Sequence, residues 1–432
     1  MLLRTSEFPV FAAALITGTP ILIIFVSTTP GFEFAGLNLY YEDLVTFILF
    51  AQILYRLPTL QRWKNCHFLY LVLGVFTIMV LVSVIRGFMT VPAKTVMNEI
   101  RTWLFPISTI YYFTSVKLTR SQLDKIGVVI EWACFIIISI TVFRLGLLAT
   151  GRAIQFSDAD TAAVHRPVPA GTAMFMCSSA IYIWYRIAKG KATRVGKFAG
   201  AILPFLVIYL QHRSVWSAFG VIIVLVLLFG QELRSRATNF IIICTCGLVA
   251  LVLLAPDSGP VKSLSESIET SHGENTTLGW REQSWTELLQ PAFIGDTMNY
   301  VIGKPMGGSL RRRLTFGKNT YFTDVAPHNL YVLLIIRCGF IGLFAFIIFM
   351  VVSFFRLFAT KDLECKVLSF ISAGVMFYWI AYTFDEPQGF YLALGIRLLI
   401  GLTDEPKSLG AGSVKSLDEN PEQSALPEPA MA

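Results

Sequence analysis

The chain has 432 residues, of which 55% are hydrophobic and 15% are charged, and its formal net charge is +7. Charged residues make up about a quarter of a typical soluble domain, so this composition excludes an ordinary soluble globular protein and predicts a polytopic membrane protein. The basic residues are scattered among short polar segments, which argues against a nucleic-acid-binding patch. The 7 cysteines show neither a disulfide framework nor the spacing of metal ligands.

Apolar runs of about 17–25 residues, long enough to cross a bilayer, recur along almost the whole sequence. They predict an all-α fold with about 12 transmembrane helices, with about eleven or about thirteen as alternatives because one run is short and another is long. The first run follows Arg4, but no small-residue cleavage site comes after it, so we expect a retained helix instead of a signal peptide. The predicted spans lie near positions 8–28, 38–56, 67–86, 98–116, 126–149, 168–186, 198–212, 214–230, 238–255, 328–357, 367–384 and 388–402.

The short loops predict the orientation. If the N-terminus is cytoplasmic, most loop lysines and arginines fall on the cytoplasmic side, and this positive-inside pattern also predicts a cytoplasmic C-terminus. Transmembrane helices 1–9 then occupy residues 1–255 and helices 10–12 occupy residues 328–402, and the polar segment 256–327 between them faces outward. Residues 403–432, rich in Pro, Glu and Ser, are predicted to form a disordered cytoplasmic tail. Long outward loops often carry function.

A short amphipathic helix is predicted inside the outward loop, in the stretch TTLGWREQSWTELLQP. Thr276 or Thr277 would cap this helix, and Pro291 would end it. Arg281 lies one turn before Trp285, so a helix resting on the membrane surface would present this arginine toward the bundle. The glycine-rich stretch IGKPMGGSL follows, and it precedes three arginines: Arg311, Arg312 and Arg313.

Several charged residues lie within or beside apolar runs. Two predicted spans meet at QHRS, residues 211–214, so Arg213 would lie in a tight outer turn. An arginine costs about 2–3 kcal/mol at the centre of a span and less toward the interface, so Arg213 needs a partner or a polar cavity. The alternative is an arginine that snorkels beside Trp216. Arg144 and Arg397 lie within a few turns of a span end, and we expect both to snorkel.

A histidine and an asparagine stand at the start of the tenth predicted span. Pro327 suits the first position of a helix, so we predict that His328 and Asn329 occupy the first turn. The helix dipole disfavours imidazolium there, so a neutral His328 could accept a proton, while a histidine that only caps the helix is the alternative. Deeper in the same run, Gly339 and Gly342 follow Arg337, so the run is predicted to divide into a short entrant helix and a true span, with Arg337 near the break. Both an ion pair and a binding role are open for this arginine.

The motifs QHRSVWSA, WREQSW, GKPMGG and HNLYVLLIIRCGFIG together resemble those of a known family. QHRSVWSA is similar to that family's arginine-containing helix turn, and WREQSW to its Arg-to-Trp helix. GKPMGG is similar to its glycine-rich segment, and HNLYVLLIIRCGFIG to its loop-exit motif HNxY, which is followed by GxxG. These features belong to the O-antigen ligase and polymerase family of integral-membrane glycosyltransferases. The resemblance covers positions 200–345, and the N-terminal half matches only in hydropathy.

The resemblance implies a fold of the GT-C type in a bacterial inner membrane, with the active site on the periplasmic face. It implies that a glycan leaves an undecaprenyl-diphosphate-linked oligosaccharide and joins an acceptor hydroxyl, without a cofactor or an obligatory metal. His328 matches the family's proposed catalytic histidine, and Arg213 and Arg281 match arginines proposed to grip the diphosphate. Further substrate-binding residues are expected at Arg311, Arg312, Arg313, Asn329 and Trp285.

Alternatives stay open at this point. The three consecutive arginines could bind the donor phosphate or an anionic lipid. The acceptor is a lipid-linked repeat for a polymerase, which is our leading interpretation, or lipid A core or a protein for a ligase. A polysaccharide transporter would suit the same spans, but no inverted halves are visible. The other expected partners are the lipid bilayer and a chain-length regulator protein, with no nucleic acid. Four loop carboxylates could supply the base in place of the histidine: Glu274, Glu282, Asp296 and Asp324.

Overall fold

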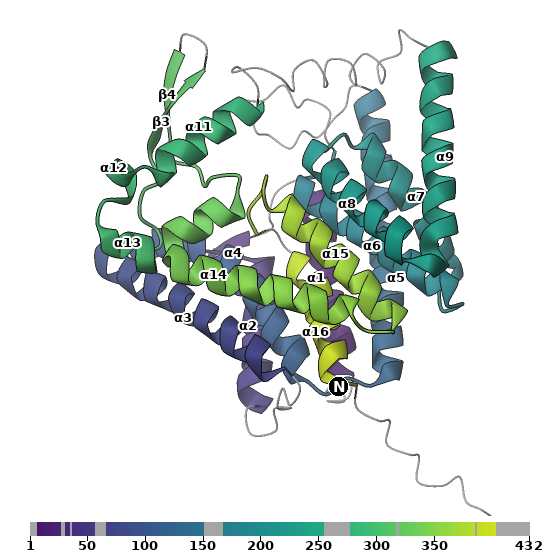
Figure 1. Ribbon diagram of the computed structural model, residues 1–432, viewed down its shortest axis with the longest axis horizontal. Coiled ribbons are helices and arrows are strands. Elements are labelled where there is room, and N and C mark those ends of the chain that lie inside the picture. The colour runs from purple at the N-terminus through teal and green to yellow at the C-terminus, as the bar shows by residue number, and fades with distance from the viewer. Residues whose placement is uncertain are drawn as a thin grey trace, which may run out of the picture.

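The computed structural model describes residues 7–26, 31–34, 37–56, 66–150, 167–254, 277–316, 319–384 and 387–402, and it is almost entirely helical (Figure 1). A helix forms at each apolar run predicted from the sequence. These helices are α1 (Phe8–Val26), α2 (Tyr41–Arg56), α3 (His67–Thr90), α4 (Ala93–Ser115), α5 (Arg120–Ala149), α6 (Ala170–Ala188), α7 (Arg194–Tyr209), α8 (Arg213–Phe229), α9 (Gln231–Leu254), α14 (Leu330–Phe358), α15 (Leu363–Tyr378) and α16 (Gln388–Ile400). The predicted tail at 403–432 lies outside the described residues.

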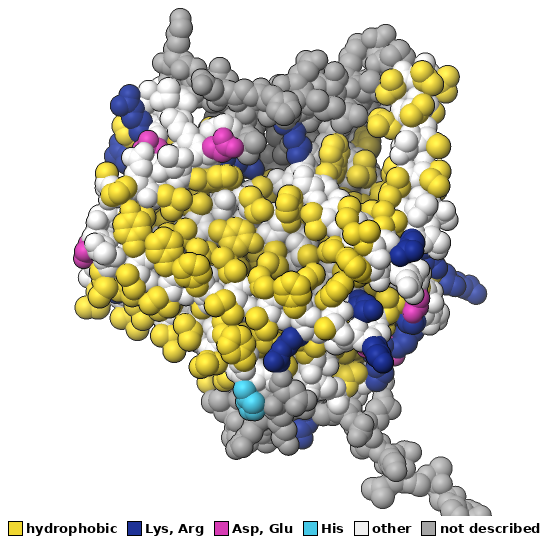
Figure 2. All heavy atoms as spheres, in the orientation of Figure 1, with side chains coloured by type: hydrophobic (Ala, Val, Ile, Leu, Met, Phe, Trp, Pro, Cys, Tyr) yellow, Lys and Arg dark blue, Asp and Glu magenta, His cyan; other side chains and the backbone are white. Residues whose placement is uncertain are grey.

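The outside of the bundle is apolar. Among the described residues, five helices are long and apolar enough to cross a membrane: α1, α3, the Arg120–Leu147 part of α5, α9 and α14. Large hydrophobic side chains are exposed along them, and Figure 2 shows these side chains as a broad band across the molecule. Contiguous apolar surface of this extent is rare on soluble monomers, so the protein is embedded in a membrane.

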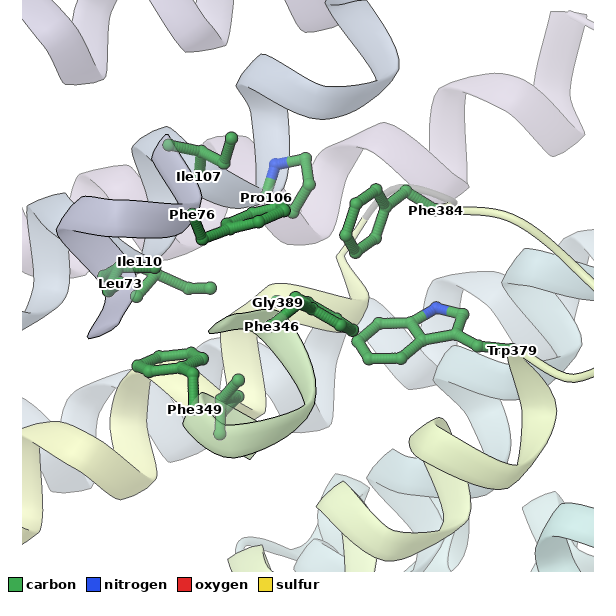
Figure 3. A pocket seen from close by; sticks show the side chains of 11 residues that line it. Leu73, Phe76, Pro106, Ile107, Ile110, Phe346, Phe349, Trp379, Phe384 and Gly389 are labelled. Atoms are coloured by element: carbon green, nitrogen blue, oxygen red, sulfur yellow. The ribbon is translucent and has the colours of Figure 1, made fainter. Parts of the chain in front are cut away.

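Helix pairs distant in the sequence pack along one another. α14 packs along α3, α15 along α8, and α16 along α4. The core is aromatic where these pairs meet: Phe346 lies 5.5 Å from Trp379, and Phe384 lies 5.6 Å from Trp103, between ring centroids. Figure 3 shows Phe346, Trp379 and Phe384 around a narrow pocket with an apolar lining. The pocket belongs to the hydrophobic core and carries no acid, base or nucleophile.

The described residues that precede α14, from Thr277 on, build a small superstructure on one end of the bundle, at the upper left of Figure 1. It contains α11 (Thr277–Leu289), α12 (Pro291–Ile294) and α13 (Thr297–Ile302). The prediction of a helix from Thr277 to the residues before Pro291 is confirmed.

Two antiparallel hairpins were not predicted. In the superstructure, β3 (Arg312–Phe316) pairs with β4 (Asn319–Thr323), so that Phe316 faces Asn319 across a two-residue connection. The sequence signal was present, because Gly317-Lys318 is a Gly-X pair between two runs rich in aromatic residues and threonine. A second hairpin, β1 (Gly31–Phe34) with β2 (Leu37–Tyr40), precedes α2 and takes the first residues of the predicted second span.

Two arginines predicted to snorkel are buried, so that prediction is wrong. Arg144 is 6% exposed, and its Nη1 donates to the carbonyl of Pro167 at 3.0 Å. Arg397 is fully buried, and its Nη2 donates to the carbonyl of Gly401 at 2.7 Å. Both guanidinium groups turn into the protein, where backbone carbonyls accept hydrogen bonds from them.

Candidate functional site

His328 lies just before α14 and not inside its first turn, which corrects the prediction from Pro327. The helix begins at Leu330, and Asn329 is its N-cap, with extended backbone and Oδ1 accepting the N–H of Val332 at 3.1 Å. Asparagine is among the best N-cap residues, so the side chain of Asn329 fixes the helix start. The side chain of Asn329 thus has a structural role, its predicted part in substrate binding stays a prediction, and His328 is the residue directly before this cap.

The start of α14 is held by the connection between α15 and α16. The N–H of Leu330 donates to the carbonyls of Trp379 and Tyr382, each at 2.9 Å. The hydroxyl of Tyr331 donates to the carbonyl of Met376 at 2.7 Å. These bonds set the position of the half-buried His328 relative to Tyr382.

Four side chains from three segments meet at this point, and we refer to Trp280, Arg281, His328 and Tyr382 as the outer cluster. The His328 ring centroid lies 5.9 Å from that of Trp280 and 6.0 Å from that of Tyr382, in edge-to-face arrangements. The Arg281 Cζ lies 5.4 Å from the centroid of the Tyr382 ring. The structure therefore brings together His328 and Arg281, two residues singled out from the sequence.

Tyr382 was missed by the sequence reasoning, because it falls inside the predicted eleventh span. α15 ends at Tyr378, and Tyr382 lies in the connection that follows. Its ring stacks on Tyr378 with the centroids 4.7 Å apart and the planes at 4°. The only available signal was an aromatic residue close to Pro387 at the outer end of a span.

Two buried donors on α11 have no acceptor among the described residues. They are Nε of Arg281 and Nε1 of Trp285, one helical turn apart. A buried donor without an acceptor costs about 1–3 kcal/mol, and more when the group is charged. The pair is therefore suited to an oxygen-rich, anionic ligand, as charge-assisted bonds from arginine to phosphate are strong.

Arg213 begins α8 directly after the predicted tight turn. Gln211 has a φ of 53°, in the left-handed region, so the chain reverses there within a few residues. The neighbours of Arg213 are structural: Nε2 of the buried His212 is 2.8 Å from the carbonyl of Val168, and Trp216 Nε1 donates to the carbonyl of Val207 at 3.1 Å.

Helix packing places Arg213 at the same end of the bundle as the outer cluster. Gly374 of α15 lies against Ala218 of α8, and Phe370 lies against Gly230, so the two helices run in opposite directions. The first turn of α8 therefore lies beside the last turn of α15, which leads into Tyr382.

The three consecutive arginines divide into one structural and two exposed residues. Arg312 is 5% exposed; its Nε donates to Ser284 Oγ at 2.6 Å, and its Nη1 donates to the carbonyls of Leu310 and Val325 at 3.0 and 2.8 Å. Burial lowers the pKa of Arg312, and the charge of Asp324 opposes this shift. Arg311 and Arg313 are exposed. Arg312 thus fastens the hairpin to α11 and is not available to a substrate in this structure.

The carboxylates considered as alternative bases are mostly engaged elsewhere. Asp324 accepts from Ser309 Oγ at 2.9 Å and from the N–H of Leu310 at 2.5 Å. Asp296 caps α13 by accepting the N–H of Met298. Glu282 is exposed on α11 next to Arg281, and Glu274 lies outside the described residues. Of the groups named, only His328 packs between the aromatic rings of the outer cluster.

Arg337 forms a buried ion pair, one of the two roles left open by the sequence. It is 1% exposed, and its Nε donates to Glu99 Oε1 of α4 at 2.6 Å. Its two other nitrogens donate to the carbonyls of Pro305 and Gly308 at 2.8 and 2.6 Å, and Glu99 Oε2 accepts the N–H of Gly307 at 2.6 Å. The pair therefore fixes the segment 303–308, which we call the glycine strap, between α4 and α14.

The predicted break in α14 is confirmed at Gly339, whose φ of 64° and ψ of −172° are not helical. The glycine strap crosses α14 at this break, and a Cβ on Gly339 would overlap the carbonyl of Val301. Gly303, with a φ of 83°, approaches the backbone of Arg337 equally closely. Only glycine permits this backbone contact, which seats the superstructure on the bundle.

α3 holds the glycine strap from its other side. The N–H of Met306 donates to the carbonyl of Ser83 at 3.0 Å, and Ser83 Oγ donates to the carbonyl of Lys304 at the same distance. Arg86 Nη1 donates to the carbonyl of Gly303 at 2.5 Å. The superstructure that carries Arg281 is thus anchored on α3, α4 and α14.

Among the residues that the structure describes, no group of three or more His, Cys, Asp or Glu side chains gathers as metal ligands would. No protein-family model matches the sequence, and no curated protein is significantly similar to it.

Proposed function

We propose that the protein is an inverting membrane glycosyltransferase that moves a glycan from an undecaprenyl-diphosphate-linked donor to an acceptor hydroxyl at the outer face of a bacterial inner membrane. The proposal includes a GT-C type fold with about 12 membrane crossings and cytoplasmic termini. The observation that carries it is the meeting of His328 and Arg281 on Tyr382, together with the buried Nε–H of Arg281 and Nε1–H of Trp285, which have no acceptor among the described residues.

The reaction follows from these groups. The acceptor oxygen attacks the anomeric carbon, and the bond from that carbon to the phosphate oxygen breaks. The diphosphate leaves with the electron pair, and the proton of the acceptor hydroxyl passes to a ring nitrogen of His328. Single displacement inverts the anomeric centre. General base catalysis of this kind contributes about 10²–10⁴-fold to the rate.

The charge that develops on the diphosphate needs stabilisation. Arg281 supplies a guanidinium with an unused Nε–H, and Trp285 supplies an N–H one turn away. Arg213, at the start of α8 on the same end of the bundle, would add a second positive charge. Donors fixed before the reaction stabilise developing charge without reorganising, which is often the largest single contribution to catalysis.

His328 is suited to be neutral before the reaction. It lies next to the N-terminus of α14, where the helix dipole disfavours imidazolium. Two aromatic rings flank it and reduce its contact with water. A neutral imidazole can take a proton, whereas an imidazolium cannot.

The protein would act as a polymerase if the acceptor is a lipid-linked repeat, and as a ligase if it is lipid A core or a protein. A chain-length regulator protein is an expected partner of the polymerase. Deleting the gene and separating the glycans of the cell on a gel discriminates the two: single repeats on the normal anchor indicate a polymerase, and long chains left on the carrier lipid indicate a ligase.

The variants His328→Ala and Arg281→Ala test the catalytic assignment in the producing cell. We expect polymer or ligated glycan to fall by at least about 100-fold, with undecaprenyl-linked units accumulating on the outer leaflet. His67→Ala is the matched control, because His67 is an exposed first residue of another helix, α3. Full glycan output from both variants at normal protein level would refute the assignment, and loss of export with units left on the inner leaflet would indicate a transporter.

A further inference from the structure

The β3–β4 hairpin has two different faces. Residues directly opposite in an antiparallel pair share a face. Arg312 and Leu314, which are 5% and 8% exposed, lie on the face against α11. The backbone N–H of Thr315 also donates to Gln283 Oε1 of α11, at 3.0 Å. The register pairs Arg313 with Phe322, and both lie on the opposite face. This second face is turned to solvent.

The outward face carries an aromatic ring between two arginines. Phe322 is 64% exposed, and the Arg311 Cζ lies 4.9 Å from the centroid of its ring. Arg311 and Arg313 are exposed, and neither pairs with a carboxylate in the described part of the chain. Figure 2 shows Lys and Arg side chains gathered at the upper left, over the hairpin. An exposed ring flanked by two unpaired positive charges favours an anionic partner that also offers an apolar face.

The hairpin is joined to the outer cluster through α11 and through the chain that leads to His328. β4 ends at Thr323, five residues before His328, and Arg312 bonds to Ser284 of α11, the helix that carries Trp280 and Arg281. In Figure 1 the hairpin extends from α11 away from the transmembrane helices. A molecule held on this face would therefore extend outward from the candidate active site.

We infer that the outward hairpin face, formed by Arg311, Phe322 and Arg313, binds a glycan whose sugars bear carboxylate groups. Guanidinium and carboxylate form bidentate, charge-assisted bonds, and the ring offers an apolar surface to the hydrogen-rich face of a sugar. The inference rests on the proposed function and names its substrate class as acidic. The donor diphosphate is a poorer occupant, because its lipid tail keeps it at the membrane, whereas the hairpin extends outward.

Binding of the full-length protein in nanodiscs of zwitterionic lipid tests this inference without requiring turnover. Polygalacturonate is the acidic probe, and dextran is the neutral one. We expect the wild type to bind polygalacturonate, more weakly as salt rises, and to leave dextran unbound. The double variant Arg311→Ala/Arg313→Ala should weaken binding by about tenfold, with Arg311→Lys/Arg313→Lys between it and the wild type.

A matched control removes the same charge elsewhere. Arg194→Ala/Lys197→Ala takes two exposed basic residues from the start of α7 and should bind polygalacturonate as the wild type does. Phe322→Ala should weaken binding without a change in charge. The melting temperature of each variant is measured as well, and it should equal that of the wild type, because the substituted side chains are exposed.

Three results would overturn the inference. The wild type binds polygalacturonate no better than dextran, the hairpin variants bind polygalacturonate as well as the wild type does, or the α7 control loses as much binding as the hairpin variant. The inference is also overturned if the hairpin variants weaken binding to nanodiscs that contain phosphatidylglycerol but leave binding of polygalacturonate unchanged. That result would assign the face to a lipid surface. The proposed function is tested by a different readout, because His328→Ala should abolish turnover and leave polygalacturonate binding intact.

Discussion

Removing the Glu99 carboxylate should destabilise the protein, because it would leave Arg337 charged and buried without its counterion. Arg337 is 1% exposed, and the side chain of Glu99 is 20% exposed. In Glu99→Ala the guanidinium keeps its two bonds to the carbonyls of Pro305 and Gly308, but it loses the carboxylate. The N–H of Gly307 loses its acceptor as well.

The magnitude follows from this geometry. Breaking a buried ion pair by removing one partner costs about 3–5 kcal/mol. Because water reaches part of Glu99 and two carbonyl bonds remain, we expect the lower end, about 3 kcal/mol. An unfolding entropy of about 2.1 cal/mol/K per residue gives about 0.9 kcal/mol/K for 432 residues, so the melting temperature should fall by about 3 °C. Glu99→Gln retains an acceptor and should lose about half as much.

A thiol-reactive fluorophore provides the assay in detergent, because unfolding exposes buried cysteines. Cys338, next to Arg337, is fully buried and reports this region directly. Lys125→Ala is the control: its Nζ is 2.8 Å from Glu7 Oε1, but the two side chains are 51% and 44% exposed. Exposed pairs contribute about 0–1 kcal/mol, so this variant should melt within about 1 °C of the wild type.

The double variant Glu99→Ala/Arg337→Met completes a thermodynamic cycle. If the ion pair stabilises the fold, the double variant is less destabilised than the sum of its single variants, because no unpaired charge stays buried. The reasoning is refuted if Glu99→Ala melts no lower than Lys125→Ala, or if the two single losses simply add.

Three further predictions concern the same superstructure. Gly339→Ala should abolish folded protein on size-exclusion chromatography, because its backbone is left-handed and closely packed, whereas Gly220→Ala, with open space around it, should fold; similar yields would contradict this. Arg312→Ala should lower the melting temperature clearly more than Arg313→Ala, because only Arg312 is buried and bonded, and equal shifts would argue against the hairpin anchor. Burial and then the charge of Arg337 lower the pKa of Lys304, so the unfolded chain binds this proton more tightly than the folded protein does. Stability of the wild type relative to Lys304→Met should therefore rise with pH from the lowered pKa to about 10.4, and a flat difference would exclude the shift.

The sequence by itself determined the helical fold and most of its elements. Apolar runs long enough to cross a bilayer predict helices, because the backbone must satisfy its hydrogen bonds within each segment. A helix stands at every run named from the sequence, α11 was predicted together with its end, and a break in α14 was expected near Arg337. Each of these features depends on residues close in the chain.

The start of α14 shows where local rules compete. Pro327 suits a first helical position, but Asn329 two residues later is a better cap and determines the helix start at Leu330. The β3–β4 hairpin carried a Gly-X signal, yet three adjacent arginines suggested a binding stretch, and only the fold shows that Arg312 is buried.

Tertiary structure alone decided which side chains meet. The chain cannot show locally that Arg337 reaches Glu99, that Arg281 lies over Tyr382, or that Arg144 turns to the carbonyl of Pro167. These contacts join residues far apart in sequence or depend on which neighbouring helix covers a face. The sequence provided His328 and Arg281 as separate residues, and the packing of α11 and of the connection after α15 against the start of α14 determines where they meet, because contacts between segments distant in the chain depend on how the helices pack.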